Sequence, residues 1–88
     1  MKYNVSLQQK ELMSNNFFKL GSTAINNAAQ WYANHGVNSI AIQAYETLMS
    51  RGQLGRLGYL RLMALYCQKW DIINANRISA RYAKIYGI

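Results

Sequence analysis

The segment that decides the fold of this chain is LGYLRLMALYCQKW, which runs from Leu57 to Trp70. Ten of its 14 residues are apolar, and they recur at the spacing of an α-helix. One apolar stripe follows positions i, i+3, i+4, i+7 and i+11 and consists of Tyr59, Leu62, Met63, Tyr66 and Trp70. A second stripe lies on a different face and consists of Leu57, Leu60, Ala64 and Cys67. Because a surface helix normally has one such stripe, the segment predicts a helix with two contact faces.

Glycines divide the rest of the chain, which contains no proline, into further helical stretches. We expect Gly36 to end one helix, the Gly21-Ser22-Thr23 run to supply a hydroxyl cap for the same helix, and Asp71 to cap the last one. We expect Ile72, Ala75, Ser79 and Tyr82 to form the packed face of this last helix. The predicted helices span residues 7–20, 24–34, 39–50, 57–69 and 72–86.

An internal repeat relates the two halves of the helical region. A shift of 34 residues aligns Tyr32 with Tyr66 and Ala41 with Ala75, and about 34 residues is the period of tetratricopeptide repeats. The same shift puts Trp70 where the turn glycine belongs. The predicted fold is therefore all-α: a single domain of stacked, tetratricopeptide-like antiparallel hairpins, with about five helices. Its parts are a leading helix (1–21), a first hairpin (22–55) and a second hairpin (56–88). A generic helical bundle with a chance 34-residue similarity is the alternative.

Composition favours a folded chain that meets a partner. Apolar residues make up 51% and charged residues 15% of the 88 residues, against about 25% charged in an average soluble domain. Disorder is excluded, because it requires low hydrophobicity and high charge. The net charge is +7, and residues 51–88 carry seven basic residues against the single acid Asp71. The electrostatic field of this excess positive charge favours an acidic or anionic partner.

Several functional classes find no support in the sequence. The single cysteine, Cys67, cannot form an internal disulfide, and we interpret it as a small apolar filler. The only histidine, His35, lies at a predicted helix end, and the three acidic residues are widely separated. We therefore expect no enzyme, no cofactor and no metal site. No apolar stretch has the length of a signal peptide or a membrane span, so we expect a cytoplasmic protein.

We expect the second apolar stripe to be buried by another helix. Repeat arrays bury their cores against neighbouring units and usually need about three of them, whereas this chain holds little more than two. We interpret the stripe as the docking site for an amphipathic helix of a partner. In the alternative interpretation the leading helix folds over it with Met13, Phe17 and Leu20.

Three short segments resemble a known family: Met1-Lys2-Tyr3, Trp31-Tyr32 before Gly36, and Leu48-Met49-Ser50-Arg51-Gly52. They are similar to the small tetratricopeptide-like chaperones of the type III secretion needle subunit, and the resemblance covers about residues 24–85. It implies a bacterial cytoplasmic complex in which the chaperone's concave face holds the amphipathic C-terminal helix of the needle subunit. This sequestration prevents premature polymerisation, and a second small helical co-chaperone packs on the N-terminal helices.

The resemblance and the stripe together define the expected site. Arg61 is expected to pair with an acidic residue on the bound helix, and Met13, Phe17 and Leu20 are expected to contact the co-chaperone. No small-molecule substrate and no membrane partner are expected. The predicted partner-binding groove consists of Gln30, Ala33, Leu57, Leu60, Arg61, Ala64 and Cys67.

The last helix carries a basic edge of Arg77, Arg81 and Lys84 at i, i+4 and i+7. A solvated face is the simplest interpretation of this edge, and docking onto an acidic partner is another. Nucleic-acid binding is the least favoured, because no helix-turn-helix or RNA-binding motif accompanies the charge. The alternative function is accordingly a small basic nucleic-acid-binding regulator, and a self-associating bundle without a client is a third possibility.

Overall fold

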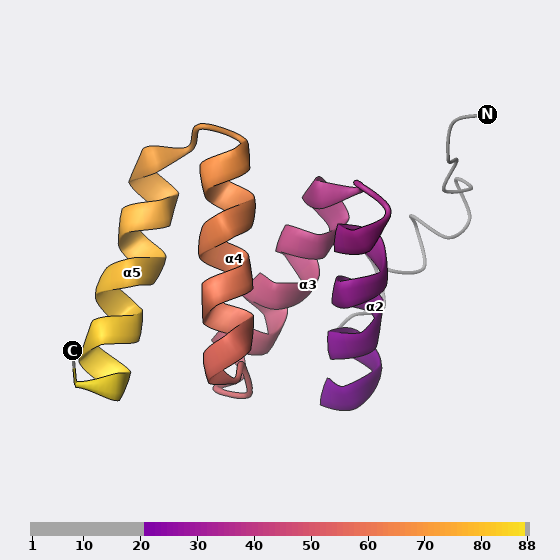
Figure 1. The fold of residues 1–88 in the computed structure, drawn as a ribbon. Coiled ribbons are helices and arrows are strands. Elements are labelled where there is room, and N and C mark those ends of the chain that lie inside the picture. The colour runs from indigo at the N-terminus through magenta and orange to yellow at the C-terminus, as the bar shows by residue number, and fades with distance from the viewer. Residues whose placement is uncertain (1–20, 88) are drawn as a thin grey trace. The chain divides into compact units, whose positions relative to one another are not determined.

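The computed structural model describes residues 21–87, and this region is entirely helical apart from its turns. The four helices of this region are α2 (Ser22–Asn34), α3 (Asn38–Ser50), α4 (Arg56–Gln68) and α5 (Ile72–Tyr86) (Figure 1). The all-α class is therefore confirmed. The helix predicted over residues 7–20 lies outside the described residues.

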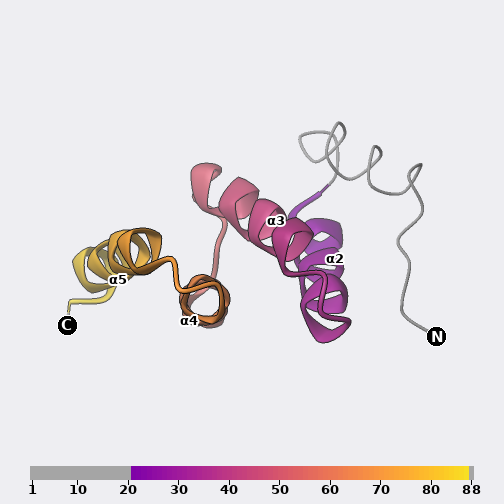
Figure 2. The same cartoon turned by 90° about the horizontal axis from the view of Figure 1, so that it is seen from above.

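The chain divides into two compact units, Met1–Gln53 and Leu54–Ile88. In the first unit α2 packs against α3, and in the second α4 packs against α5. Figures 1 and 2 show α4 and α5 side by side and connected by a short turn, so that they run antiparallel. We call the described parts of the two units the first and second hairpins.

The first hairpin buries one narrow stripe of α2 and most of α3. Ile25, Ala29 and Tyr32 are the buried residues of α2, and their spacing of i, i+4 and i+7 places them on one face. Ala29 and Ala41 have no exposed surface, and small side chains such as these allow two helices to pack closely. The buried residues of α3 are Ile40, Ala41, Ile42, Ala44, Tyr45, Thr47, Leu48 and Met49.

Aromatic rings fill the second hairpin. The Tyr82 ring meets Tyr59 edge-on, with 6.3 Å between the centroids, and lies 4.8 Å from Tyr86. Gly58 has a steric reason to be glycine, because a Cβ at this position would clash with the buried side chain of Leu54. The other buried residues of the hairpin are Leu62, Leu65, Tyr66, Ala75 and Ile78.

The helix bounds repeat at the interval found in the sequence. Helix α2 begins at Ser22 and α4 begins 34 residues later at Arg56. Helix α3 begins at Asn38 and α5 begins 34 residues later at Ile72. The two hairpins therefore place corresponding sequence positions at corresponding helix ends.

Three of the helices end in the same backbone motif. After α2, the N–H of Gly36 donates to the Ala33 carbonyl and the N–H of Val37 to the Tyr32 carbonyl, which is the Schellman arrangement. The residue at the centre of this motif adopts a left-handed conformation. It is Gly36 after α2 (φ +77°), Gly52 after α3 (φ +70°) and Trp70 after α4 (φ +59°).

The predicted caps are partly right. Asp71 caps α5 as expected, because its side chain accepts a hydrogen bond from the Asn74 N–H at 3.2 Å. The hydroxyl cap predicted for α2 is wrong: Gly21 is the N-cap, without a side-chain hydrogen bond, and Ser22 is already helical. The helix starts earlier than predicted because the extended backbone of Gly21 (φ −70°, ψ 159°) marks its boundary.

Candidate partner-binding surface

The two apolar stripes predicted for α4 differ in how far they are buried. Leu62 and Tyr66 of the first stripe are buried. In the second stripe Leu57 is 58% exposed and Leu60 is 43% exposed, and Ala64 and Cys67 are also exposed. We call these four residues the α4 stripe. An apolar row that stays on the surface of a folded helix is typical of an interaction site.

The α4 stripe extends along most of the length of α4. Leu57 and Cys67 are ten positions apart, which corresponds to about 15 Å along the helix axis. A partner helix of about three turns spans the same distance. Cys67 is a free, exposed thiol at one end of the stripe, so chemical modification can report on whether the stripe is covered.

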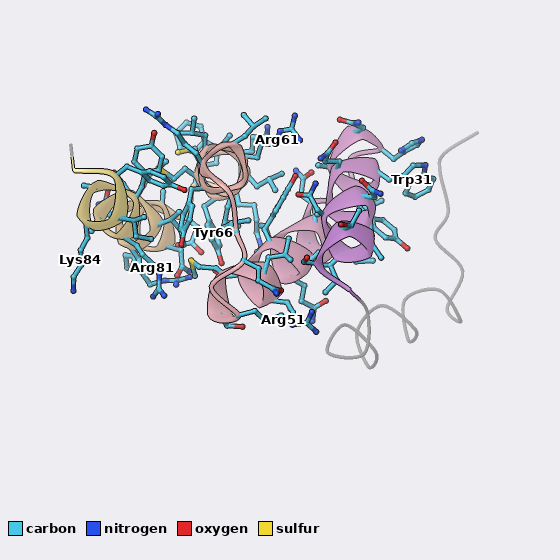
Figure 3. The ribbon with its side chains drawn as sticks, turned by 90° about the horizontal axis from the view of Figure 1, so that it is seen from below. Trp31, Arg51, Arg61, Tyr66, Arg81 and Lys84 are labelled. Carbon is cyan, nitrogen blue, oxygen red and sulfur yellow. The ribbon has the colours of Figure 1, made fainter. Side chains whose placement is uncertain are left out.

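Arg61 lies at the border of the α4 stripe. It follows Leu57 by four positions and precedes Ala64 by three, and residues at these spacings are neighbours on a helix surface. Its side chain is partly exposed, and Figure 3 shows it projecting from α4 on the side away from Arg81 and Lys84 of α5. Arg61 therefore supplies a positive charge beside an apolar row.

The remaining predicted groove residues lie on the first hairpin. Gln30 and Ala33 are half-buried on α2, three positions apart, so they share a face of that helix. Their participation in the same groove as the α4 stripe stays a prediction. The residues predicted to contact the co-chaperone, Met13, Phe17 and Leu20, lie outside the described residues, as does the leading helix that would alternatively cover the stripe.

Trp70 does not continue the first apolar stripe of α4, so this part of the prediction is wrong. The side chain is 85% exposed, because α4 ends at Gln68 and the left-handed backbone at Trp70 breaks the helical spacing. A spacing of i+11 from Tyr59 places a residue on the stripe only while the helix continues. The turn hydrogen bond of the Asp71 N–H to the Tyr66 carbonyl closes the helix here.

The packed face predicted for α5 is also partly wrong. Ala75 and Tyr82 are buried as expected, but Ile72 and Ser79 are exposed, and Ile78 is buried in their place. The buried face follows i, i+3 and i+7 from Ala75 to Tyr82, which leaves the first turn of the helix outside the core. As a result Ile72 is 53% exposed and Ile73 is 83% exposed. Trp70, Ile72 and Ile73 are three large apolar residues on either side of the helix cap Asp71, and this grouping can be seen in the sequence.

His35 lies at the end of α2, as its sequence position indicates. It is the C-cap of α2, and its Nδ1 atom lies 2.7 Å from the Trp31 carbonyl oxygen. Since a carbonyl oxygen only accepts, Nδ1 is the donor. The imidazole also stacks on the Trp31 ring with 4.0 Å between the centroids. Within residues 21–87 no group of histidine, cysteine and carboxylate side chains has the arrangement of a metal site.

The second hairpin is strongly basic, with Asp71 as its one acidic side chain. Hydrogen bonds from the Asn74 side chain and the Asn74 backbone N–H lower the pKa of Asp71, and Lys69 and Arg77 lower it further. Arg56 is held by Tyr82, whose hydroxyl accepts a hydrogen bond from Nε at 2.7 Å. The second hairpin therefore carries an excess of positive charge.

None of the four described helices is both long and apolar enough to cross a membrane. The chain matches no family model, no curated protein and no solved structure.

Proposed function

We propose that this protein is a helix-binding chaperone, and that the α4 stripe holds an amphipathic helix of its client. The observation that carries the proposal is the exposure of Leu57 and Leu60 on the helix whose opposite face is buried. Covering two half-exposed leucines contributes about 1 kcal/mol each. Amphipathic helices commonly bind such rows through apolar anchors at i, i+3, i+4 and i+7.

The recurrence of the helix bounds supports a tetratricopeptide-like arrangement of the hairpins. Helices α2 and α4, and likewise α3 and α5, begin 34 residues apart, which matches the period of that repeat. In such arrays the first helix of each hairpin contributes to a concave ligand-binding surface. Helices α2 and α4 are the first helices of their hairpins, and Gln30 and Ala33 stay part of the proposed groove.

The proposed client is a needle subunit of a type III secretion system, in line with the sequence resemblance. Holding its C-terminal amphipathic helix on the α4 stripe would block the surface through which subunits polymerise. Arg61 would pair with an acidic residue on that helix. A small helical co-chaperone would contact Met13, Phe17 and Leu20, and the complex would form in the bacterial cytoplasm.

Substitution of the central leucine tests this proposal. We expect Leu60→Asp to abolish binding of a peptide that spans the C-terminal helix of a needle subunit, because a carboxylate in an apolar contact loses its hydration. Its helical content by circular dichroism should match the unmodified chain, since Leu60 is not part of the buried core. Undiminished binding by this variant would contradict the assignment of the stripe.

The matched control is Ile85→Asp, which introduces the same charge on α5. Ile85 is 52% exposed, close to the exposure of Leu60, but it lies on another helix of the same hairpin. This control should bind the peptide as the unmodified chain does. Loss of binding in both variants would indicate a general effect of negative charge instead of a contact at the stripe.

A second candidate function is supported by the exposed basic residues of α5. Arg77, Arg81 and Lys84 are all exposed, and a row of cations is the electrostatic signature of phosphate binding. Titration of a single-stranded oligonucleotide at increasing salt separates the two functions. Binding through phosphates should weaken steeply with salt, whereas peptide binding to an apolar stripe should not.

A further inference from the structure

Trp70 occupies a backbone position that the fold fills with glycine elsewhere. The turns after α2 and α3 have Gly36 and Gly52 at the left-handed position, and the turn after α4 has Trp70 there, with φ +59°. The hydrogen bonds of the three turns correspond: the Asp71 N–H donates to the Tyr66 carbonyl just as the Val37 N–H donates to the Tyr32 carbonyl. A bulky L-residue in this conformation is strained.

Packing of the Trp70 side chain does not offset this backbone strain. The Trp70 side chain is 85% exposed, so it adds little to the core of the second hairpin. Strained residues of this kind concentrate at functional sites, and tryptophan is enriched among the residues that dominate protein–protein binding. Ile72 and Ile73 are exposed on the first turn of α5 next to it. We call these three residues the turn cluster.

The turn cluster continues into the outer face of α5. Ile73, Arg77, Ala80 and Lys84 recur at i, i+4, i+7 and i+11 and are all exposed, with Arg81 beside them. This row lies opposite the buried residues Ala75, Ile78 and Tyr82. Figure 3 shows Arg81 and Lys84 projecting from the same side of α5. From Ile73 to Lys84 the face is about 17 Å long.

The charges of this face select its partner. Every charged residue on it is basic, and Asp71, the one acid of the hairpin, is engaged with Asn74 through hydrogen bonds of 3.2 and 2.8 Å. A second copy of the chain is disfavoured, because each copy carries a net charge of +7 and like charges repel. Ile72 and Ile73 add exposed aliphatic surface beside Trp70, which suits the apolar face of a protein helix. The Trp70 ring would also allow a base to stack, so an oligonucleotide is included in the titration.

We propose that the turn cluster and the outer face of α5 form a second docking surface, which binds an acidic amphipathic helix of a partner protein. The apolar side chains of that helix contact Trp70 and Ile73. Its carboxylates pair with Arg77, Arg81 and Lys84. This surface is separate from the α4 stripe and does not depend on the function proposed for it.

Fluorescence of Trp70 tests the proposal directly. The chain has two tryptophans, so Trp31→Phe leaves Trp70 as the sole reporter. We expect its emission to shift to shorter wavelength when a synthetic helical peptide with a leucine face and a glutamate face is added. A scrambled peptide of the same composition and a lysine counterpart are the controls, and neither should produce the shift. Absence of a shift with the acidic peptide at low salt would overturn the proposal.

Two sets of variants locate the binding. We expect Trp70→Gly to weaken binding of a fluorescently labelled acidic peptide at least tenfold, with an unchanged or raised melting temperature, because glycine adopts the left-handed turn without strain. Arg81→Glu with Lys84→Glu should weaken it similarly, whereas Arg51→Glu in the first hairpin should not. Leu60→Asp should leave this binding intact, so that failure at the α4 stripe and failure here are distinguishable.

Other ligand classes are separate outcomes of the same titration. A shift of the Trp70 emission with a single-stranded oligonucleotide, or with vesicles of phosphatidylcholine and phosphatidylserine, but not with the acidic peptide, would assign the surface to nucleic acid or to a membrane and overturn the proposal. Unchanged affinity of Trp70→Gly for the acidic peptide would equally overturn it.

Discussion

Arg56 in the first turn of α4 donates a hydrogen bond from Nε to the Tyr82 hydroxyl in the last part of α5, over 2.7 Å. The guanidinium carbon also lies 5.8 Å from the Tyr82 ring centroid and 5.6 Å from that of Tyr86, within range of a cation–π interaction. This contact joins the ends of the two helices that are opposite the connecting turn. It therefore holds α4, and the stripe on it, against α5.

Removing the hydroxyl tests the contribution of this contact. We expect Tyr82→Phe to lower the free energy of unfolding by about 1 kcal/mol, because a part-buried hydrogen bond to a charged group is lost while the ring is kept. Denaturant unfolding measures the change. Tyr86→Phe is the control, since the Tyr86 ring faces the same guanidinium, and it should change the stability less. An equal loss in both variants would contradict the role of the hydrogen bond.

Left-handed turns at Gly36 and Trp70 should respond oppositely to substitution. A non-glycine residue in this conformation costs about 1–2 kcal/mol, while glycine loses about 0.5–1 kcal/mol more chain entropy on folding. We expect Trp70→Gly to stabilise the protein by up to about 1 kcal/mol and Gly36→Ala to destabilise it by about 1 kcal/mol. A Cβ at Gly36 would meet no neighbouring atom within 4 Å, so its cost is conformational. Thermal unfolding of the two variants checks the contrast, and destabilisation by Trp70→Gly would show a packing role that its exposure does not suggest.

Asp71 should make the second hairpin sensitive to acid. The Asn74 side chain lowers the pKa of Asp71, followed by the Asn74 backbone N–H, so the ionised form is favoured in the folded state. Its contribution to stability is present above the unfolded pKa of about 3.9 and is lost as the pH falls through the lower folded value.

Comparison with an amide isolates this effect. Asn caps helices about as well as Asp but does not titrate, so Asp71→Asn should show a smaller fall in melting temperature as the pH is lowered from about 5 to about 2. The other carboxyl groups titrate in both proteins and cancel in the comparison. Identical pH profiles would show that the cap does not depend on the charge.

Much of the fold follows from local sequence signals. Helix α5 runs from Ile72 to Tyr86 as predicted, because Asp71 supplies a cap at its start and Gly87 adopts the left-handed conformation at its end. The two stripes of α4 follow from helical spacing alone. Leu62 of the first stripe is buried and Leu57 of the second is exposed, and what covers the second stripe stays a prediction.

The errors arise where tertiary packing or backbone strain decides. Trp70 is as apolar as a core residue, and its sequence position does not reveal that the backbone turns left-handed there. Ile72 and Ile78 are equally good core residues in sequence, and only the packing of α5 on α4 selects Ile78. For the same reason helical spacing identifies Gln30 and Ala33 as one face of α2 but does not determine what that face meets.

Reactivity of Cys67 tests the central claim most directly, because this only thiol of the chain is exposed at one end of the α4 stripe. We predict that a thiol reagent labels the isolated protein readily. Saturation with a peptide spanning the C-terminal helix of a needle subunit should slow labelling at least tenfold, and Leu60→Asp should restore the rate. Unchanged labelling while that peptide is demonstrably bound would place the client elsewhere and contradict the account.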